Sequence, residues 1–230
     1  MGAEHAVNLR ESLASALEWW RDAGLDTLTE DDARDWLARP VAAPEAAPAV
    51  AAAPVETLAA NLDDFVAWRM AGTAPEAGWM SPRIGPGGDP ASKFVVLVDA
   101  PCAEDSETLL GGAEGRLFDR MLAAIGLTRE SVYLTALAWA RPVAGQILPA
   151  DAPRLIQLAR HHLTLLRPER LLLVGQASVG VIEGDGLDDV NQFGGNTQVA
   201  AIRHPRFLME RPAAKSEAWK QLLRLTRGSQ

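Results

Sequence analysis

Two polar clusters in this sequence each follow an apolar run and carry side chains that can do chemistry. The run Phe94–Val98 stops at Asp99, and the run Val199–Ile202 is followed by His204 and Pro205. A carboxylate can orient water or stabilise a cation, and an imidazole can donate a hydrogen bond to developing negative charge. In an open parallel sheet, the site forms at the carboxyl ends of the strands. We therefore expect both clusters to build one site at such an edge.

The segments that must position these clusters alternate between apolar strands and amphipathic helices. The pattern predicts strands at about 94–98, 132–138, 170–174 and 198–202, and helices at about 55–71, 113–125, 151–166, 176–183 and 214–225. Strands that alternate with helices indicate a mainly parallel sheet with helices on both faces. The predicted fold is therefore an α/β domain with three layers, α/β/α.

The N-terminal part has a different character. Residues 1–40 predict an acidic helical extension with an apolar stripe from Leu9 to Trp20. Residues 41–54 form an Ala/Pro tract whose three prolines prevent a continuous helix, which indicates a linker. The α/β domain then spans residues 55–230. If the protein is a binding module rather than an enzyme, we expect the helical extension to be its docking element for a protein partner.

Composition excludes several classes of protein. The single Cys102 excludes a disulfide framework, and it excludes any four-cysteine cluster or four-cysteine zinc site built within one chain. No charged and apolar leader opens the sequence and no apolar run is long enough to span a bilayer, so we expect a soluble cytoplasmic protein without membrane contact.

The net charge of −8 is unevenly distributed along the chain. Residues 1–88 carry 14 acidic and 6 basic side chains, whereas residues 89–230 carry 16 of each. The acidity therefore belongs to the N-terminal part, and local basic patches near the C-terminus can still bind phosphate.

Five blocks in the C-terminal part resemble, in order, the motifs of the uracil-DNA glycosylase superfamily, closest to its family 4. The blocks are Gly88-Asp89-Pro90 with the strand and turn up to Cys102, Gly112 to Leu122, Thr135 to Pro142, Leu165 to Gly175, and His204 to Pro212 with Lys215 and Trp219. They match the family patterns GDP…GEAPG, GRAG-x-LLDRML, TN-x-x-K-C-RP, LLRP-x-hydrophobic-x-LG and HPAYLLR-x-P. The resemblance covers about residues 86–225. It implies a DNA partner and hydrolysis of the N-glycosidic bond of deaminated or damaged bases, as in base excision repair.

The resemblance also implies roles for individual residues. His204 matches the histidine that hydrogen-bonds the base as negative charge grows on it, and Asp99 replaces a glutamate that assists water or stabilises the sugar cation. Base contacts are expected from Ala100, Pro101, Cys102, Leu110, Ala136 and Trp139. DNA contacts are expected from Arg203, Arg206, Phe207, Leu208, Arg211 and Lys215, with Phe207, Leu208 or Met209 as the wedge inserted into the base stack.

Three departures from the family pattern keep other functions open. Ala136 replaces the Asn that reads uracil, Leu110 aligns with the stacking Phe, and the last two iron–sulfur positions fall at Ala140 and Leu155. We therefore expect no iron–sulfur cluster, no other cofactor and no metal, in a monomer. Trp139 is then the candidate base platform, and Cys102 is interpreted as a small filler rather than a nucleophile.

Two alternatives follow from these departures. The absence of a base-reading side chain at position 136 favours a catalytically inactive glycosylase fold that serves as a DNA-binding or protein-interaction module. The neutral charge of residues 89–230 fits a small-molecule N-glycosidase or a nucleotide-binding protein. The latter predicts binding of free bases with little salt dependence, in contrast to DNA binding.

Overall fold

The computed structural model describes residues 58–71, 74–143, 145–182 and 192–227, with five further positions near the N-terminus. The chain divides into two units, Met1–Pro54 and Val55–Gln230. In the first unit the described positions, all helical and exposed, are Ala14, Ser15, Glu18, Trp19 and Asp22. The remainder of the acidic extension and the Ala/Pro tract lie outside the described residues, so the predicted domain boundaries stay a prediction. Within the described ranges, no helix is both long and apolar enough to cross a membrane.

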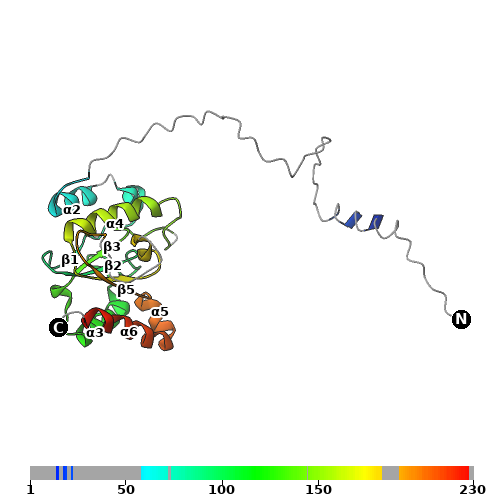
Figure 1. Ribbon diagram of the computed structural model, residues 1–230. Coiled ribbons are helices and arrows are strands. Elements are labelled where there is room, and N and C mark those ends of the chain that lie inside the picture. The colour runs from blue at the N-terminus through cyan, green and yellow to red at the C-terminus, as the bar shows by residue number, and fades with distance from the viewer. Residues whose placement is uncertain are drawn as a thin grey trace, which may run out of the picture. The chain divides into compact units, whose positions relative to one another are not determined.

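The second unit is built on a five-stranded sheet with the strand order β1-β3-β2-β4-β5 (Figure 1). The strands are β1 (Gly87–Gly88), β2 (Phe94–Val98), β3 (Tyr133–Ala136), β4 (Arg170–Val174) and β5 (Gln198–Ile202). Strands β3, β2, β4 and β5 are parallel, whereas β1 pairs with β3 in the antiparallel direction. The mainly parallel sheet is therefore confirmed. The edge strand β1 was not predicted, because two glycines carry no apolar signal.

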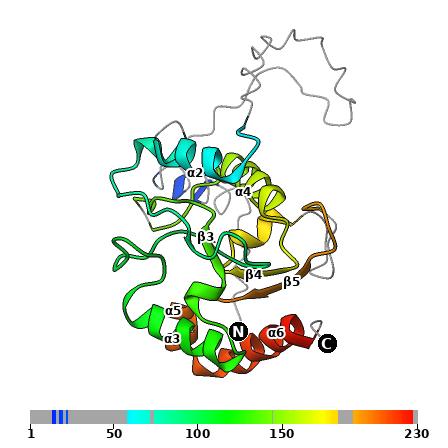
Figure 2. The ribbon, with the colours of Figure 1, turned by 90° about the vertical axis from the view of Figure 1, so that its left-hand side faces the viewer.

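Helices cover both faces of this sheet (Figure 2). Three helices pack on one face, namely α3 (Gly112–Ala124), α5 (Pro205–Glu210) and α6 (Lys215–Arg227). Helix α4 (Ala152–Leu166) packs on the opposite face, and α2 (Leu62–Ala71) lies against α4. The predicted three-layer α/β/α fold is confirmed.

The alternation of side chains along β2 explains why two cores form. Phe94, Val96 and Val98 point into the core beneath α3, α5 and α6, whereas Val95 and Leu97 point into the core beneath α4. All five are buried, since successive side chains of a strand point to opposite faces and both faces are covered. A strand in this position must be apolar throughout, and this is the pattern that the sequence shows.

Two elements differ from the sequence prediction at the edge of the sheet that carries the carboxyl ends. The helix predicted at 176–183 is a four-residue 3-10 helix, η3 (Ser178–Val181). It ends before Ile182, whose extended backbone, with ψ of 135°, is incompatible with a helix. The segment after His204 was predicted as a turn but forms α5, with Pro205 at its first position, where the missing N–H costs nothing.

A buried ion pair fixes α2 and the 3-10 helix η1 (Pro75–Gly78) to the segment that follows β3. Arg69 Nη2 lies 2.7 Å from Glu76 Oε1, and both side chains are fully buried. The same Arg69 nitrogen donates to the carbonyl of Leu137, and Glu76 Oε1 accepts the backbone N–H of Trp139 at 3.0 Å. Burial lowers the pKa of Arg69, although Glu76 opposes this effect.

Candidate functional site

A cavity of about 720 Å³ lies at the carboxyl edge of the sheet. Its walls come from the turn after β2, the first turn of α3, and the start of α5. The predicted site residues that line it are Asp99, Ala100, Pro101, Cys102, His204, Arg206 and Phe207. The carboxyl ends of the parallel strands thus bring together segments that are about a hundred residues apart in sequence, as expected for this sheet.

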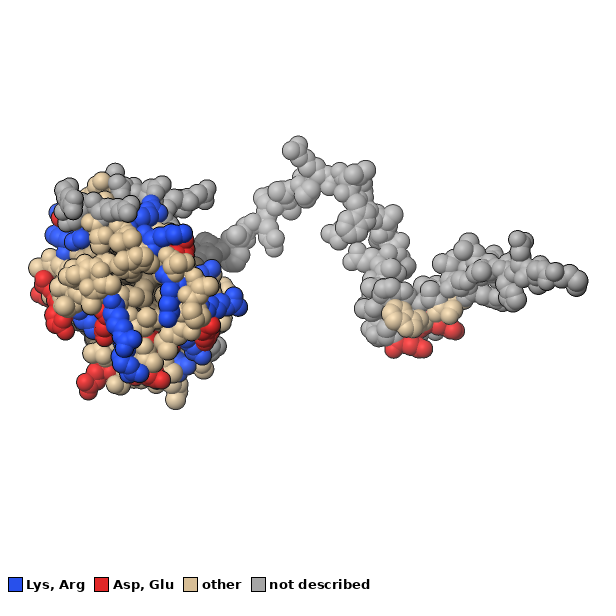
Figure 3. All heavy atoms as spheres, turned by 90° about the horizontal axis from the view of Figure 1, so that it is seen from below, with Lys and Arg blue, Asp and Glu red and all other residues tan. Residues whose placement is uncertain are grey.

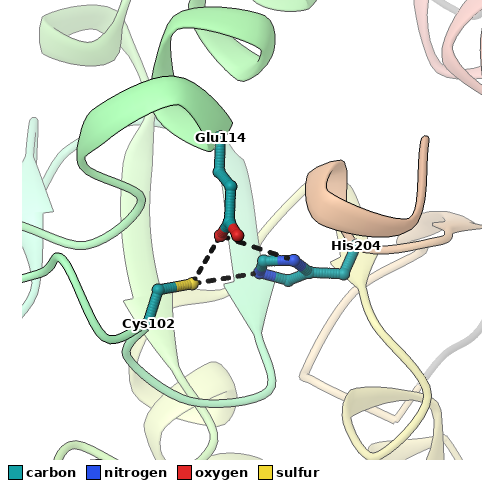
Figure 4. Close-up of side chains that lie close together, drawn as sticks. All are labelled: Cys102, Glu114 and His204. Atoms are coloured by element: carbon teal, nitrogen blue, oxygen red, sulfur yellow. Dashed lines mark hydrogen bonds and ion pairs between the residues drawn. The ribbon is translucent and has the colours of Figure 1, made fainter. Parts of the chain in front are cut away.

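Three side chains of different chemistry meet at this cavity (Figure 4). Cys102 lies in the turn after β2, Glu114 in the first turn of α3, and His204 at the start of α5. The Cys102 thiol donates to Glu114 Oε2 at 2.8 Å, and its Sγ lies 3.5 Å from His204 Nε2. His204 Nδ1 is 3.9 Å from Glu114 Oε2. All three side chains are partly buried.

Asp105 fixes the loop that carries Cys102. Its Oδ2 accepts the backbone N–H groups of Cys102 at 2.8 Å and Leu110 at 3.0 Å, and its Oδ1 accepts that of Gly111 at 2.6 Å. A carboxylate that accepts three backbone hydrogen bonds closes the loop on itself and sets where α3 begins. Asp105 therefore positions Cys102 opposite Glu114.

The hydrogen bonding of His204 determines which ring nitrogen carries a proton. The backbone N–H of Arg206 donates to His204 Nδ1 at 3.3 Å, so Nδ1 is unprotonated in the neutral ring. Burial lowers the pKa of His204 below its ordinary value of 6.5, and nearby carboxylates, first Glu114, oppose this only in part. At neutral pH the ring is therefore uncharged and presents an Nε2–H donor beside Cys102.

Cys102 is held as a thiol. Burial raises its pKa, and the hydrogen bond to Glu114 raises it further because the carboxylate disfavours a second negative charge. A free thiolate is therefore scarce at neutral pH, which argues against Cys102 as a nucleophile in this conformation.

Asp99 closes the turn between β4 and η3. Its Oδ2 accepts the backbone N–H of Gln176 at 2.8 Å, and its Oδ1 accepts that of Ser178 at 2.7 Å. A Cβ on Gly175 would lie 2.1 Å from the Asp99 carboxylate, so this approach requires glycine. Asp99 is thus a fixed carboxylate on the cavity wall whose remaining lone pairs can accept from water.

Of the six predicted DNA-contacting residues, only Arg206 and Phe207 line the cavity. Phe207 lies between two arginines, with the guanidinium carbons of Arg203 and Arg211 at 5.5 and 5.2 Å from its ring centroid. Leu208 is buried in the core, whereas Met209 is 44% exposed and lines the cavity. Of the three wedge candidates, Phe207 and Met209 line the cavity, and Met209 is the more exposed of the two.

The basic side chains belong to a mixed surface. Figure 3 views the molecule from below, the end at which Figure 1 draws α3, α5 and α6, and shows blue Lys and Arg side chains together with red Asp and Glu side chains. Arg206 pairs with Glu210 at 3.3 Å, and both are largely exposed. Lys215 lies away from the cavity, in a shallow apolar groove between α3 and α6.

Comparison with known proteins identifies the fold. The family model of the uracil DNA glycosylase superfamily matches residues 86–223, which is more than half of the chain. The chain belongs to the uracil DNA glycosylase superfamily. It is 27% identical over 149 residues to the type-4 uracil-DNA glycosylase of Archaeoglobus fulgidus, and the match covers 56% of this chain and 73% of that protein. The resemblance to family 4 seen in the sequence is confirmed.

Three residues assigned to base binding do not line the cavity of this superfamily member. Ala136 and Leu110 are buried in the core beneath α3. The Trp139 ring is fully buried, with the Arg69 guanidinium 4.7 Å from its centroid and Phe65 and His162 at its edges. The described structure therefore leaves no open face of Trp139 on which a base can stack.

Glu114 is the site residue that the sequence reasoning missed. A glutamate in the first turn of a helix is ordinarily explained by the helix dipole, so its type and position gave no separate signal. Its role is visible only because α3 packs against α5, which carries His204. The one available hint was that Glu114 lies only two residues after the Gly111-Gly112 loop, within the second block that resembles the family.

Proposed function

We propose that this protein is a diverged DNA glycosylase that releases deaminated or damaged bases by hydrolysis of the N-glycosidic bond. The observation that carries this proposal is the neutral His204 ring, which presents an Nε2–H at the cavity. A neutral donor fixed at this place can stabilise the negative charge that grows on a departing base. The backbone N–H of Arg206 supports this role, because it donates to His204 Nδ1 and so keeps the proton on Nε2.

The charges that line the cavity favour a dissociative route. Asp99, Glu104 and Glu114 contribute carboxylates to the wall. When the base leaves with its electron pair, the sugar becomes an oxocarbenium cation, and nearby carboxylates stabilise that cation. Asp99 is held by two backbone amides, so it is placed to orient the water that attacks the sugar. The anionic walls disfavour phosphate inside the cavity, so phosphates are assigned to the rim near Arg206.

Base selection must differ from that of the family pattern. Position 136 carries a buried alanine and offers no side-chain donor or acceptor. Loss of a polar reader typically lowers discrimination by about 10⁴-fold. We therefore expect a relaxed preference in which uracil, hypoxanthine and xanthine are all candidates. Arg141 and Met209, which line the cavity, are candidates to contact the base.

A single-turnover assay with protein in excess tests this function. Oligonucleotides with uracil, hypoxanthine or xanthine, single or double stranded, are incubated with the wild type and with His204→Ala. The variant should lose about 10² to 10³ in rate, the usual effect of removing one oxyanion donor. His161→Ala is the matched control, because His161 bonds the carbonyl of Ala59 at 2.7 Å and does not line the cavity. Equal base release by both variants would refute the role of His204.

The second candidate is a module that binds DNA without cutting it. The burial of Ala136, Leu110 and Trp139 favours it, because none of the three offers a contact to a flipped base. This alternative predicts no base release from any oligonucleotide but retained binding. The affinity should fall steeply with salt, because the contacts are to phosphates through Arg203, Arg206 and Arg211. Binding of free bases with little salt dependence would instead support a small-molecule N-glycosidase.

A further inference from the structure

The Cys102–Glu114–His204 cluster has the composition of a metal site. One ligand atom from each residue lies within 4.8 Å of the other two, and all three residues are partly buried. The three come from a strand-end turn, a helix and a helix start, so the tertiary fold, and not local sequence, brings them together. A single cysteine cannot build a four-cysteine site, but here an imidazole and a carboxylate supply the other ligands.

One distance, between the Cys102 sulfur and His204 Nε2, agrees with a tetrahedral site. Zinc binds thiolate at ~2.3 Å and imidazole at ~2.05 Å, so a tetrahedral angle places sulfur and nitrogen ~3.5 Å apart. The observed separation of Cys102 Sγ and His204 Nε2 is 3.5 Å. Glu114 Oε2 is closer to the sulfur, at 2.8 Å, because the thiol proton bridges them. Removal of that proton ends the hydrogen bond and lets the carboxylate move outward to an ordinary ligand position.

We propose that Cys102, Glu114 and His204 bind one Zn²⁺ ion, with the fourth coordination position open to the cavity. Mixed sulfur, nitrogen and oxygen ligands suit a borderline-soft ion such as Zn²⁺, whereas Mg²⁺ and Ca²⁺ prefer oxygen alone. Three protein ligands with one open position are typical of zinc sites that hold water or an exogenous ligand. Asp105, which fixes the backbone N–H of Cys102, orients the sulfur ligand without touching the metal.

Metal binding moves two protons in this cluster. The thiol of Cys102 loses its proton to solvent as the sulfur–zinc bond forms. His204 must offer the Nε2 lone pair, so its proton moves from Nε2 to Nδ1 through solvent, with no net release. This tautomer change breaks the hydrogen bond from the Arg206 N–H to His204 Nδ1, which is long at 3.3 Å. One proton is therefore released for each Zn²⁺ bound.

Zinc binding and base release are mutually exclusive on this geometry. The proposed glycosylase step uses Nε2–H as a donor, whereas zinc uses the same nitrogen as a lone-pair ligand. The zinc-loaded protein should therefore be inactive towards DNA, and a chelator should restore the activity. The metal site itself does not depend on the protein being a glycosylase, because it rests on the three side chains alone.

Cobalt spectroscopy and zinc calorimetry on the full chain test the site. Co²⁺ should give a thiolate-to-cobalt charge-transfer band and visible bands of tetrahedral intensity, and Zn²⁺ should displace it at one ion per chain with one proton released. Cys102→Ser should abolish the charge-transfer band, and Glu114→Gln should weaken zinc binding by more than about tenfold, since loss of even an outer-shell partner costs 10- to 100-fold. Glu107→Gln, an exposed carboxylate of the same loop, should change neither.

The results separate this site from the proposed function. Absence of the charge-transfer band in the wild type, or zinc binding that Cys102→Ser leaves unchanged, would overturn the site even if DNA bases are released. Suppose that zinc binds at one ion per chain but no base is released, whether chelator is present or absent. This result would support the metal site and refute the glycosylase function. The thermal unfolding midpoint of each variant is measured as a control. A variant that unfolds at the wild-type temperature but lacks the charge-transfer band has lost a ligand and not its fold.

Discussion

Removal of one partner of the buried Arg69–Glu76 pair should destabilise the protein strongly. Both side chains are fully buried, so Glu76→Gln leaves the Arg69 guanidinium without a counter-charge in the core. The amide oxygen of the new side chain would still accept from the Trp139 N–H, so the substitution isolates the charge. An uncompensated buried charge costs about 3 to 5 kcal/mol. For a chain of this size, that corresponds to a fall in Tm of roughly 6 to 20 °C.

The assay is urea unfolding followed by fluorescence and circular dichroism, because coincident transitions are required for a two-state free energy. Arg69→Met should cost a similar amount, since it leaves the Glu76 carboxylate unpaired. The double variant should be more stable than either single variant, because no lone charge remains in the core. Glu210→Gln, which breaks an exposed pair with Arg206, is the control and should change the stability by less than about 0.5 kcal/mol.

A loss below about 1 kcal/mol for both single variants would refute the reasoning. It would mean that water reaches the pair or that the charges are neutralised in the native state. The anchoring of α2 and η1 to the segment after β3 would then need another explanation.

Three further predictions concern the core and the β4–η3 turn. Burial lowers the pKa of His162 to about 3, so between pH 6.5 and this value the unfolded state binds more protons than the folded state. The free energy of unfolding should therefore decrease as the pH is lowered through this range, by up to about 1.4 kcal/mol per pH unit, and His162→Gln should flatten this slope in unfolding measurements. Gly175→Ala should destabilise by more than the roughly 1 to 3 kcal/mol of a disfavoured backbone, because its Cβ meets the Asp99 carboxylate, whereas Gly126→Ala has open space and should show the backbone cost alone; equal losses in thermal unfolding would contradict this contact. Asp99→Asn replaces one of two acceptor oxygens by a donor and should cost about 1 to 3 kcal/mol while it slows base release; unchanged kinetics would remove Asp99 from the proposed reaction.

The central strands could be predicted from the sequence because burial on both faces demands an uninterrupted apolar run. Residues 94–98, 170–174 and 198–202 have this pattern and form β2, β4 and β5 with the predicted bounds. Helix α5 was harder to predict, because Pro205 is as common in turns as at helix starts. Its six residues are also too few to show the spacing of apolar residues that marks a helix. The 3-10 helix η3 is short because the backbone becomes extended at Ile182, which the residue types of this segment do not signal.

The candidate site could be predicted only in part. The position of Asp99 and His204 at strand ends followed from the sheet, since parallel strands present their carboxyl ends at one edge. The contact between Cys102, Glu114 and His204 depends on the packing of α3 against α5, which no local pattern encodes. Trp139 was assigned to the base because of its place after β3, but the residues of α2 and α4 that enclose it are remote in sequence.

The pH dependence of base release tests the central claim most directly, namely that a neutral His204 stabilises the departing base. Single-turnover rates on uracil-containing single-stranded DNA, measured with chelator present, should be nearly constant from about pH 7.5 to 8.5. Burial lowers the pKa of His204 below its ordinary value, so the imidazole is mainly uncharged in this range. His204→Ala should be slower at every pH. A rate that falls about tenfold per unit as the pH rises would indicate a protonated histidine and contradict the account. So would the absence of any released base.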